Sequence, residues 1–229
     1  MIVTIKYQEK FKDETISSYA QQWTTDFGDI VQQSCECQYD IYSAGPNYPN
    51  AGVKLAIQKN SHSQTQSSKT AIVMESKGIK SAEIMKSKGI DVFEDSPLIP
   101  GNEGLEFGDS LIAISDVGIA DPESHQLQLQ NVQLKFSGID ISNDIDVSNI
   151  EIFYAMLMDD NHQGNPNLSI YNLLRGNALP LLEVLKSQGV DVNTPLKDMA
   201  IASQFDVISD APIIDTLGST VGSEILLGV

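Results

Sequence analysis

The chain has 229 residues, of which 41% are hydrophobic and 20% are charged, and its formal net charge at pH 7 is −17. These proportions are typical of a folded protein and exclude a wholly disordered chain. The acidity argues against a nucleic-acid-binding protein, which needs a basic face, and no apolar run in the sequence approaches the ~20 residues of a membrane-spanning helix.

The first third of the chain predicts strands around one amphipathic helix. Alternating side chains predict a strand over residues 2–7. Residues 38–43 and 52–58 predict a hairpin because turn formers separate them, and the wholly polar stretch 59–70 predicts a surface loop. The helix is predicted to be capped by Asp13, and its apolar stripe consists of Ile16, Tyr19, Ala20, Trp23, Phe27, Ile30 and Val31.

The middle of the chain is predicted to continue the sheet. A strand over 70–76, a helix over 80–88 and a strand over 89–93 have the spacing of a βαβ unit with a parallel pair. The turn-rich stretch 95–109 predicts a linker or a surface excursion. Strands are expected again at 111–115 and at 127–136, and a change of apolar phase at Gln130 and Asn131 predicts a bulge or a bend in the second of these.

Helical signals dominate after residue 147. The spacing of a capping box over 148–151 predicts a helix there, although the run that follows is also rich in strand formers. Two more helices are predicted over 167–175 and 178–188, each stopped by the glycine that follows it. A last helix is predicted over 194–203, because it begins with a threonine and a proline.

Together these elements predict an α+β fold. The sheet is expected to be mixed and to occupy the N-terminal two-thirds, with a long N-terminal amphipathic helix, while helices are concentrated after residue 147. We therefore expect a β-rich α/β region over 1–147 and a mainly helical region over 148–229, packed on the first as one globular unit.

Charge is distributed unevenly along the chain. Residues 1–90 contain ten basic and nine acidic residues, whereas residues 91–229 contain four basic and twenty-two acidic residues. Arg175 is the only arginine, so bidentate phosphate binding is disfavoured. The acidic part of the chain could face a basic partner, bind cations or keep the protein soluble.

Cys35 and Cys37 are the only cysteines, and at one residue apart they are poorly placed for a disulfide. We expect two reduced thiols, at least one of them packed as a small apolar group. The sequence begins without the basic and apolar pattern of a secretory signal. Reduced thiols without such a signal predict a cytoplasmic or particle-associated protein.

The segment from Asp140 to Glu151 is a candidate calcium site. Its oxygen-bearing side chains follow the spacing of an EF-hand loop, and the predicted carboxylate ligands are Asp140, Asp144, Asp146 and Glu151. Ile145 stands where such a loop needs glycine, so a solvated acidic face is the alternative interpretation.

A second candidate metal site is the segment 159–165. Asp159, Asp160 and His162 could bind a metal or transfer protons. The same residue types are also ordinary turn formers. The other two histidines, His62 and His125, stand alone in the sequence, and the three together match no zinc pattern.

No catalytic or nucleotide-binding motif is found in the sequence. We therefore predict a non-catalytic structural or protein-interaction protein without a cofactor, for example a subunit of a phage or injection-machine particle. Its expected partners are proteins or further copies of itself, and neither nucleic acid nor a membrane. The alternatives are an enzyme with a scattered, possibly metal-assisted site, and an acidic inhibitor or immunity-type binder of a basic partner.

Overall fold

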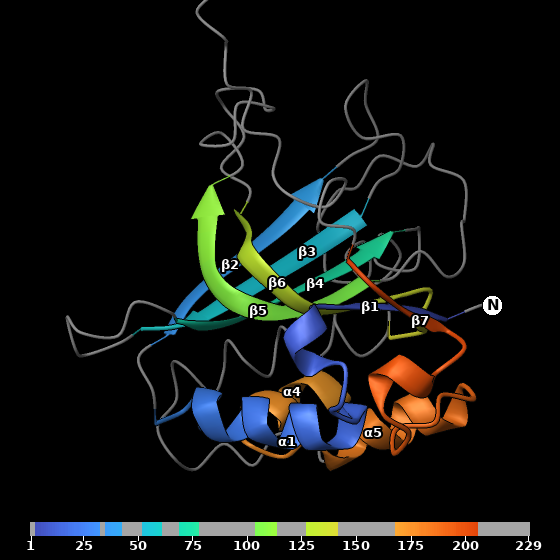
Figure 1. Ribbon diagram of the computed structural model, residues 1–229. Coiled ribbons are helices and arrows are strands. Elements are labelled where there is room, and N and C mark those ends of the chain that lie inside the picture. Colours follow the sequence, from blue (N-terminus) through green and yellow to red (C-terminus); the bar gives the residue numbers. More distant parts are fainter. Residues whose placement is uncertain are drawn as a thin grey trace, which may run out of the picture.

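The structure of the protein is a computed structural model. Its described part is a seven-stranded sheet covered on one face by helices (Figure 1). The structure describes residues 3–32, 35–42, 52–60, 69–77, 104–113, 127–141 and 168–205. The strand order is β2-β3-β4-β5-β6-β1-β7. All neighbouring strands run antiparallel except β1 and β7, which are parallel. The α+β class is therefore confirmed, with a mostly antiparallel sheet.

Strands β2 to β6 form a continuous antiparallel series. Their bounds are Cys35–Tyr42 for β2, Gly52–Lys59 for β3, Thr70–Lys77 for β4, Gly104–Ala113 for β5 and Leu127–Ser137 for β6. The hairpin of β2 and β3 and the strands β4 and β6 confirm the predictions for these segments. The predicted helix and parallel strand over 80–93 lie outside the described residues.

The prediction of a linker or surface excursion over 95–109 is wrong for residues 104–109, the part of this stretch that the structure describes. Strand β5 begins at Gly104, and Leu105 and Phe107 are buried in the core. The glycines of this stretch are typical of turns, but Gly104 and Gly108 pair with Ser137 and Val132 of β6. Pairing with two neighbouring strands has overridden the local turn signal.

Helix α1 (Ile16–Phe27) follows strand β1 (Thr4–Tyr7) and a 3₁₀ turn, η1 (Glu9–Phe11). Its N-cap is Thr15 rather than Asp13. The Thr15 hydroxyl accepts a hydrogen bond from the Ser18 amide at 3.0 Å, and Ser18 Oγ accepts one from the Thr15 amide at 3.0 Å, which is a capping box. The helix ends before Gly28, so it is shorter than the predicted stripe, although Ile30 beyond it is still buried.

Two helices follow in the C-terminal part, α4 (Ser169–Leu174) and α5 (Leu179–Ser187). As predicted, each is followed by a glycine with a positive φ, 85° at Gly176 and 84° at Gly189, a conformation that L side chains avoid. The helix predicted over 194–203 is wrong. That segment holds only a 3₁₀ turn, η3 (Leu196–Asp198), and a short strand, β7 (Ala202–Gln204), which pairs with β1.

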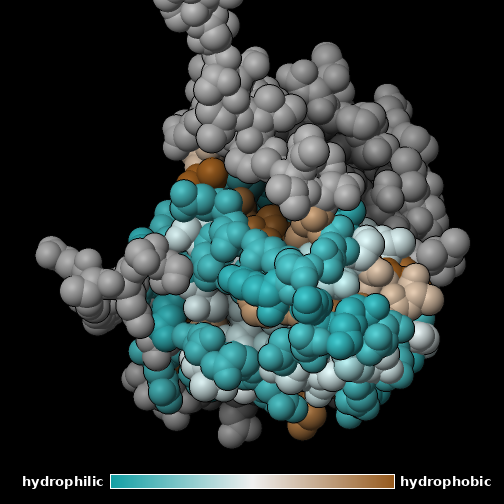
Figure 2. All heavy atoms as spheres, viewed as in Figure 1, coloured by the Kyte–Doolittle hydropathy of each residue, from teal (hydrophilic) through white to brown (hydrophobic). Residues whose placement is uncertain are grey.

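The main hydrophobic core lies between the sheet and the layer of α1, α4 and α5 (Figure 1). It contains buried side chains from β1, α1, β3 to β6, α4 and α5, and it extends to Leu196 and Met199. Below the sheet, where the helices lie, the visible surface of the described residues is mostly hydrophilic (Figure 2). No described helix has both the length and the apolar character needed to cross a bilayer. The division of the chain at residue 147 stays a prediction.

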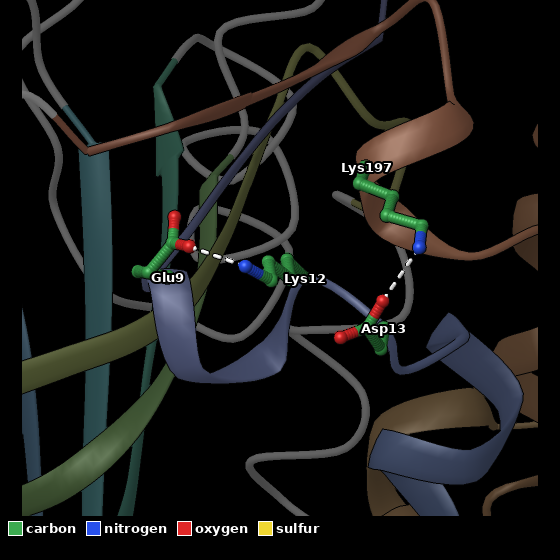
Figure 3. A network of polar contacts seen from close by, with 4 residues as sticks. All are labelled: Glu9, Lys12, Asp13 and Lys197. Carbon is green, nitrogen blue, oxygen red and sulfur yellow. Dashed lines mark hydrogen bonds and ion pairs between the residues drawn. The ribbon is translucent and has the colours of Figure 1, made fainter.

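The segment that precedes β7 is tied to the start of α1 by main-chain contacts. The Leu196 amide donates to the Glu14 oxygen at 2.8 Å, and the Lys197 amide donates to the Lys12 oxygen at 3.0 Å. Lys197 Nζ also lies 2.7 Å from Asp13 Oδ1, and Figure 3 shows this pair. Asp13, predicted as the helix cap, thus contacts the other segment instead. A separate pair in the same view joins Lys12 and Glu9 at 2.7 Å. Exposed pairs of this kind contribute little to stability.

Candidate functional site

The hairpin of β5 and β6 is irregular at one point, and its curvature is visible in Figure 1. Phe107 pairs with Leu134 but Gly108 pairs with Val132, so Gln133 of β6 has no residue opposite it. This is a β-bulge, which bends a strand and increases its twist. It lies within three residues of the phase change predicted at Gln130 and Asn131. Two residues further along β5, Ser110 has φ 55° and its amide donates to the Lys69 oxygen at 2.8 Å.

Beyond the bulge, β5 is held against β3 by a buried glutamine. The Gln58 side chain is only 3% exposed. Its Oε1 accepts a hydrogen bond from the Leu111 amide at 2.6 Å, and its Nε2 donates to Glu36 at 3.2 Å. Because a buried amide needs partners, Gln58 fixes the position of the curved half of β5.

A second, smaller hydrophobic cluster is built from side chains of β3, β4, β5 and β6. It lies apart from the main core and consists of Ala56, Ala71, Val73 and Leu129, with Leu111, Leu127 and Val132 packed against it. Its members on β3 and β4 alternate with core residues such as Leu55, Ile57 and Ile72, so they belong to the sheet face opposite the helices. The sheet is therefore apolar on both faces near the β5–β6 hairpin.

The bulge also carries a chain of hydrogen bonds between the sheet and α1. Tyr19 Oη donates to Gln133 Oε1 at 2.9 Å, and Gln133 Nε2 donates to Asp109 Oδ2 at 2.6 Å. Asn131 Nδ2 donates to the same carboxylate oxygen at 3.2 Å, and Asn131 Oδ1 accepts from Gln8 Nε2 at 2.5 Å. Burial, and then the charges of Asp109 and Asp26, raise the pKa of Tyr19, so its hydroxyl stays a donor.

This group of residues was missed from the sequence because 95–109 was interpreted as a linker. The available signal was Gly108 inside an otherwise apolar, alternating stretch. An isolated glycine in a strand pattern indicates a bulge or a close approach of two backbones. The structure shows both, and Asp109, Asn131 and Gln133 are polar residues gathered at that point.

The predicted metal ligands are mostly outside the described residues. Asp140 is described: it is exposed, its amide donates to Gln188 Oε1 at 2.8 Å, and its carbonyl accepts from Gln188 Nε2 at 3.0 Å. The remaining candidates, Asp144, Asp146, Glu151, Asp159, Asp160 and His162, lie outside the described ranges. Within those ranges no three His, Cys, Asp or Glu side chains are grouped for metal binding. Both metal sites therefore stay predictions.

The two cysteines are free thiols. Both lie on the edge strand β2, where residues two apart point to the same face. Cys35 is half-buried and packs against the main core, whereas Cys37 is exposed. Burial raises the pKa of the Cys35 thiol to about 11, although Lys59 acts in the opposite direction. At neutral pH Cys35 is therefore protonated, and it is a poor nucleophile and a poor metal ligand.

We expect the alkylation of Cys35 to accelerate with pH beyond the range of an ordinary thiol. In a Cys37→Ser background, the iodoacetamide rate at Cys35 should rise about tenfold per pH unit from pH 8 to pH 10, because only the thiolate reacts. The alkylation rate of a free cysteine, whose pKa is about 8.5, levels off in the same pH range. Mass spectrometry of quenched samples measures the rate, and a plateau by pH 9 would contradict the burial of Cys35.

Comparisons with known proteins give one consistent result. The sequence profile of the heme-binding protein A (HasA) family matches residues 1–229. A search of curated proteins gives no match. Among solved structures, the apo hemophore HasA from Yersinia pestis is 28% identical, with a TM-score of 0.54, and the match covers 89% of this chain and 97% of that one.

Two further structures extend this result. The holo hemophore HasA from Yersinia pestis is 28% identical with a TM-score of 0.53, over 89% of this chain and 99% of that one. A tyrosine-to-alanine variant of HasA from Yersinia pseudotuberculosis, described as a monomer, is 26% identical with a TM-score of 0.52 over the same shares. The similarity therefore includes both a ligand-free and a ligand-bound form of one hemophore.

Proposed function

This chain belongs to the heme-binding protein A (HasA) family, and from that membership we propose that it binds heme outside the cell and carries it to a protein receptor. The observation that supports the proposal most strongly is the match of the family profile to the whole sequence, residues 1–229. The similarity to a holo hemophore over 89% of the chain adds to it. Heme is, in this proposal, the cargo of the protein.

Family membership corrects four of the predictions made from the sequence. The prediction of a structural protein or assembly subunit, such as part of a phage or injection-machine particle, is wrong. The alternative prediction of an acidic inhibitor is wrong as well. The expected absence of a cofactor is contradicted, because the family binds heme. A cytoplasmic or particle-associated location is contradicted as well, since HasA hemophores are secreted. Of the expected partners, a protein is retained as the proposed recipient of heme.

The physical reason for these errors is that heme binding needs no consecutive motif. A heme site needs an apolar cavity and one or two axial donors, which can be His, Tyr, Cys or Met. Such donors can come from distant segments, so single histidines at 62, 125 and 162 gave no pattern. The location was inferred from reduced thiols and from the start of the sequence, and neither observation identifies a compartment.

Four of the described donors are poorly suited to bind iron, each for a structural reason. Tyr19 donates its hydroxyl proton to Gln133, and Tyr171 Oη accepts from Arg175 at 3.0 Å. Met74 is fully buried in the main core, and Cys35 is a protonated, half-buried thiol. We propose that the iron ligand is instead a histidine or tyrosine outside the described set, or a tyrosine of β2 whose side chain is not described: His62, His125, His162, Tyr39, Tyr42, Tyr48 and Tyr154.

The charges of the chain limit how the propionates of heme can be held. Arg175, the only arginine, already pairs with Asp29 at 2.7 Å and with the Tyr171 hydroxyl. A bidentate arginine clamp for a propionate is therefore not available without breaking this pair. We propose that heme is held mainly by apolar contact and by its iron ligand, with the propionates directed towards solvent.

Single substitutions at the candidate donors test both the function and the assignment. We expect hemin to give a saturable change in the Soret absorption of the purified chain. Tyr19→Phe, Cys35→Ser and Met74→Leu should leave the spectrum of the complex unchanged, whereas substitution of the true ligand should shift it or weaken binding at least tenfold. Absence of a saturable Soret change would contradict heme binding, and a spectrum altered by any of the three control substitutions would contradict only the assignment.

A further inference from the structure

Residues 190–205, which follow α5, form a segment that we call the C-terminal strap. Its strand β7 lies beside β1, on the side that β6 leaves free (Figure 1). The Ile5 amide donates to the Ile201 oxygen at 2.9 Å. The Phe205 amide donates to the Tyr7 oxygen at 3.0 Å. The strap thus completes the sheet at β1, although the two segments stand at opposite ends of the described chain.

The strap also supplies an acceptor to the start of α1. The first amides of a helix have no partner within the helix. The capping box satisfies the Ser18 amide, whereas the Ser17 amide donates to the Val192 oxygen at 2.9 Å. The turn η3 of the strap adds two main-chain bonds to the residues just before α1. The N-terminus of α1 therefore depends on a distant segment for one of its hydrogen bonds.

Four apolar side chains of the strap belong to the main hydrophobic core. They are Val190, Val192, Leu196 and Met199, which are between 0% and 8% exposed. The same core contains the buried face of α1 and side chains of β1. Burial of four such side chains contributes a free energy of the same order as the net stability of a whole domain. Loss of the strap would therefore remove a large share of what stabilises the N-terminal part.

The contacts of the strap join positions that are far apart in the sequence. Closing so long a loop costs conformational entropy before any contact compensates for it, so contacts of this kind form late in folding. Until they form, β1 has only β6 as a neighbour in the sheet. The amides and carbonyls that the strap satisfies then have no partner in the chain, which is costly wherever they are shielded from water.

We infer that the C-terminal strap is the closing element of this fold. The elements β1, η1 and α1 become stable only once residues 190–205 have docked on them, and the strap and this N-terminal part open and close as one unit. A chain whose strap has not been synthesised, or is held away by another molecule, is therefore open at its N-terminal part. The inference does not depend on heme binding and is tested on the heme-free chain.

Native-state hydrogen exchange of the full chain tests whether the two parts open together. At low urea concentrations, the Leu196 and Phe205 amides of the strap and the Ala20 and Trp23 amides of α1 should open with equilibrium constants that agree within about threefold. NMR spectra recorded during exchange into D2O measure these constants. Strap amides that open at least about tenfold more often than the α1 amides would overturn the inference, because α1 would then be stable without the strap.

A weakened strap should loosen α1 to the same degree. Leu196 is fully buried, and Leu196→Ala should raise the exchange rates of the Phe205 and Trp23 amides by the same factor, at least about tenfold. Leu129→Ala is the matched control, because it removes the same atoms from the second hydrophobic cluster, where Leu129 is 6% exposed. This control should raise the exchange rate of the Trp23 amide by less than about threefold. Equal effects of the two truncations on the Trp23 amide would refute the inference.

A charge placed in the strap gives a second test, by fluorescence. In Leu196→Asp an unpaired carboxylate would have to be buried, so the strap should not dock. Trp23, the only tryptophan, is 4% exposed, and its emission should move to that of a water-exposed indole without urea. Leu129→Asp should keep the emission of the parent chain. Parent-like emission in Leu196→Asp, or the same change in both variants, would contradict the closing role of the strap. If Leu196→Asp unfolds the whole chain, hydrogen exchange in Leu196→Ala still decides.

Discussion

Replacing Gly108 by alanine is expected to lower the free energy of unfolding by about 3 kcal/mol, near the upper end of what overpacking costs. A Cβ atom built at this position would lie 2.1 Å from the Asn131 carbonyl oxygen and 3.0 Å from its carbonyl carbon. Both are main-chain atoms of β6, so no side-chain rotation can relieve the clash. For a chain of this length the melting temperature should fall by roughly 6–12 °C, as measured by circular dichroism.

Gly104→Ala is the matched control, because it lies four residues earlier on the same strand. Its Cβ atom would approach only the Phe136 carbonyl oxygen, at 3.8 Å, which is ordinary van der Waals contact. We expect the stability of this variant to lie within about 0.5 kcal/mol of the parent chain. Equal melting temperatures for the two variants would show that β5 and β6 do not have the described register.

Phe107→Ala is the second substitution with a large expected effect, about 3–5 kcal/mol of destabilisation. Phe107 is 1% exposed and joins α1 to the sheet. Its ring makes edge-to-face contacts with Tyr19, Trp23 and Phe136, at centroid distances of 5.8, 5.2 and 6.2 Å. Truncation removes these contacts and leaves a cavity between the layers, because the surrounding rings belong to different elements and cannot all close in.

Urea unfolding followed by tryptophan fluorescence measures this effect, since Trp23 lies against Phe107. Leu179→Ala is the control, because Leu179 is 60% exposed and its truncation should change stability by less than about 0.5 kcal/mol. A Phe107→Ala variant as stable as the Leu179→Ala variant would contradict the packing of α1 on β5.

The elements that the sequence predicted well are those in which local and tertiary signals agree. Helices α4 and α5 have apolar residues at helical spacing and end at Gly176 and Gly189, whose backbone conformations suit only glycine well. Strand β6 has alternating apolar residues, and even its bulge was indicated by the change of phase. In each case the residue pattern and the final packing require the same conformation.

The elements that were predicted wrongly are those decided by distant partners. Residues 104–109 contain two glycines and looked like a turn, but β4 and β6 on either side give them the pairing of a central strand. Residues 202–204 looked like the end of a helix, but β1 pairs with them from the other end of the chain. Periodicity within a short window does not contain this information.

The candidate site could not be predicted for a related reason. The groups that meet at the bulge, Tyr19, Asp109 and Gln133, are separated by up to 114 positions, and each residue taken alone is unremarkable. The heme site that we propose would likewise leave no continuous signal, since an axial donor is a single residue and the apolar surface is shared among many. The acidity of the chain argued against nucleic acid as a partner, but the prediction of a cofactor-free protein went beyond that observation.

Native mass spectrometry of the chain after mixing with hemin and desalting is the most direct test of heme carriage. We expect one dominant species whose mass exceeds that of the chain by a single heme, and an unchanged share of this species in the Leu179→Ala variant. Recovery of the chain without heme, or with a graded series of several hemes per chain, would contradict a specific heme site and with it the proposed function.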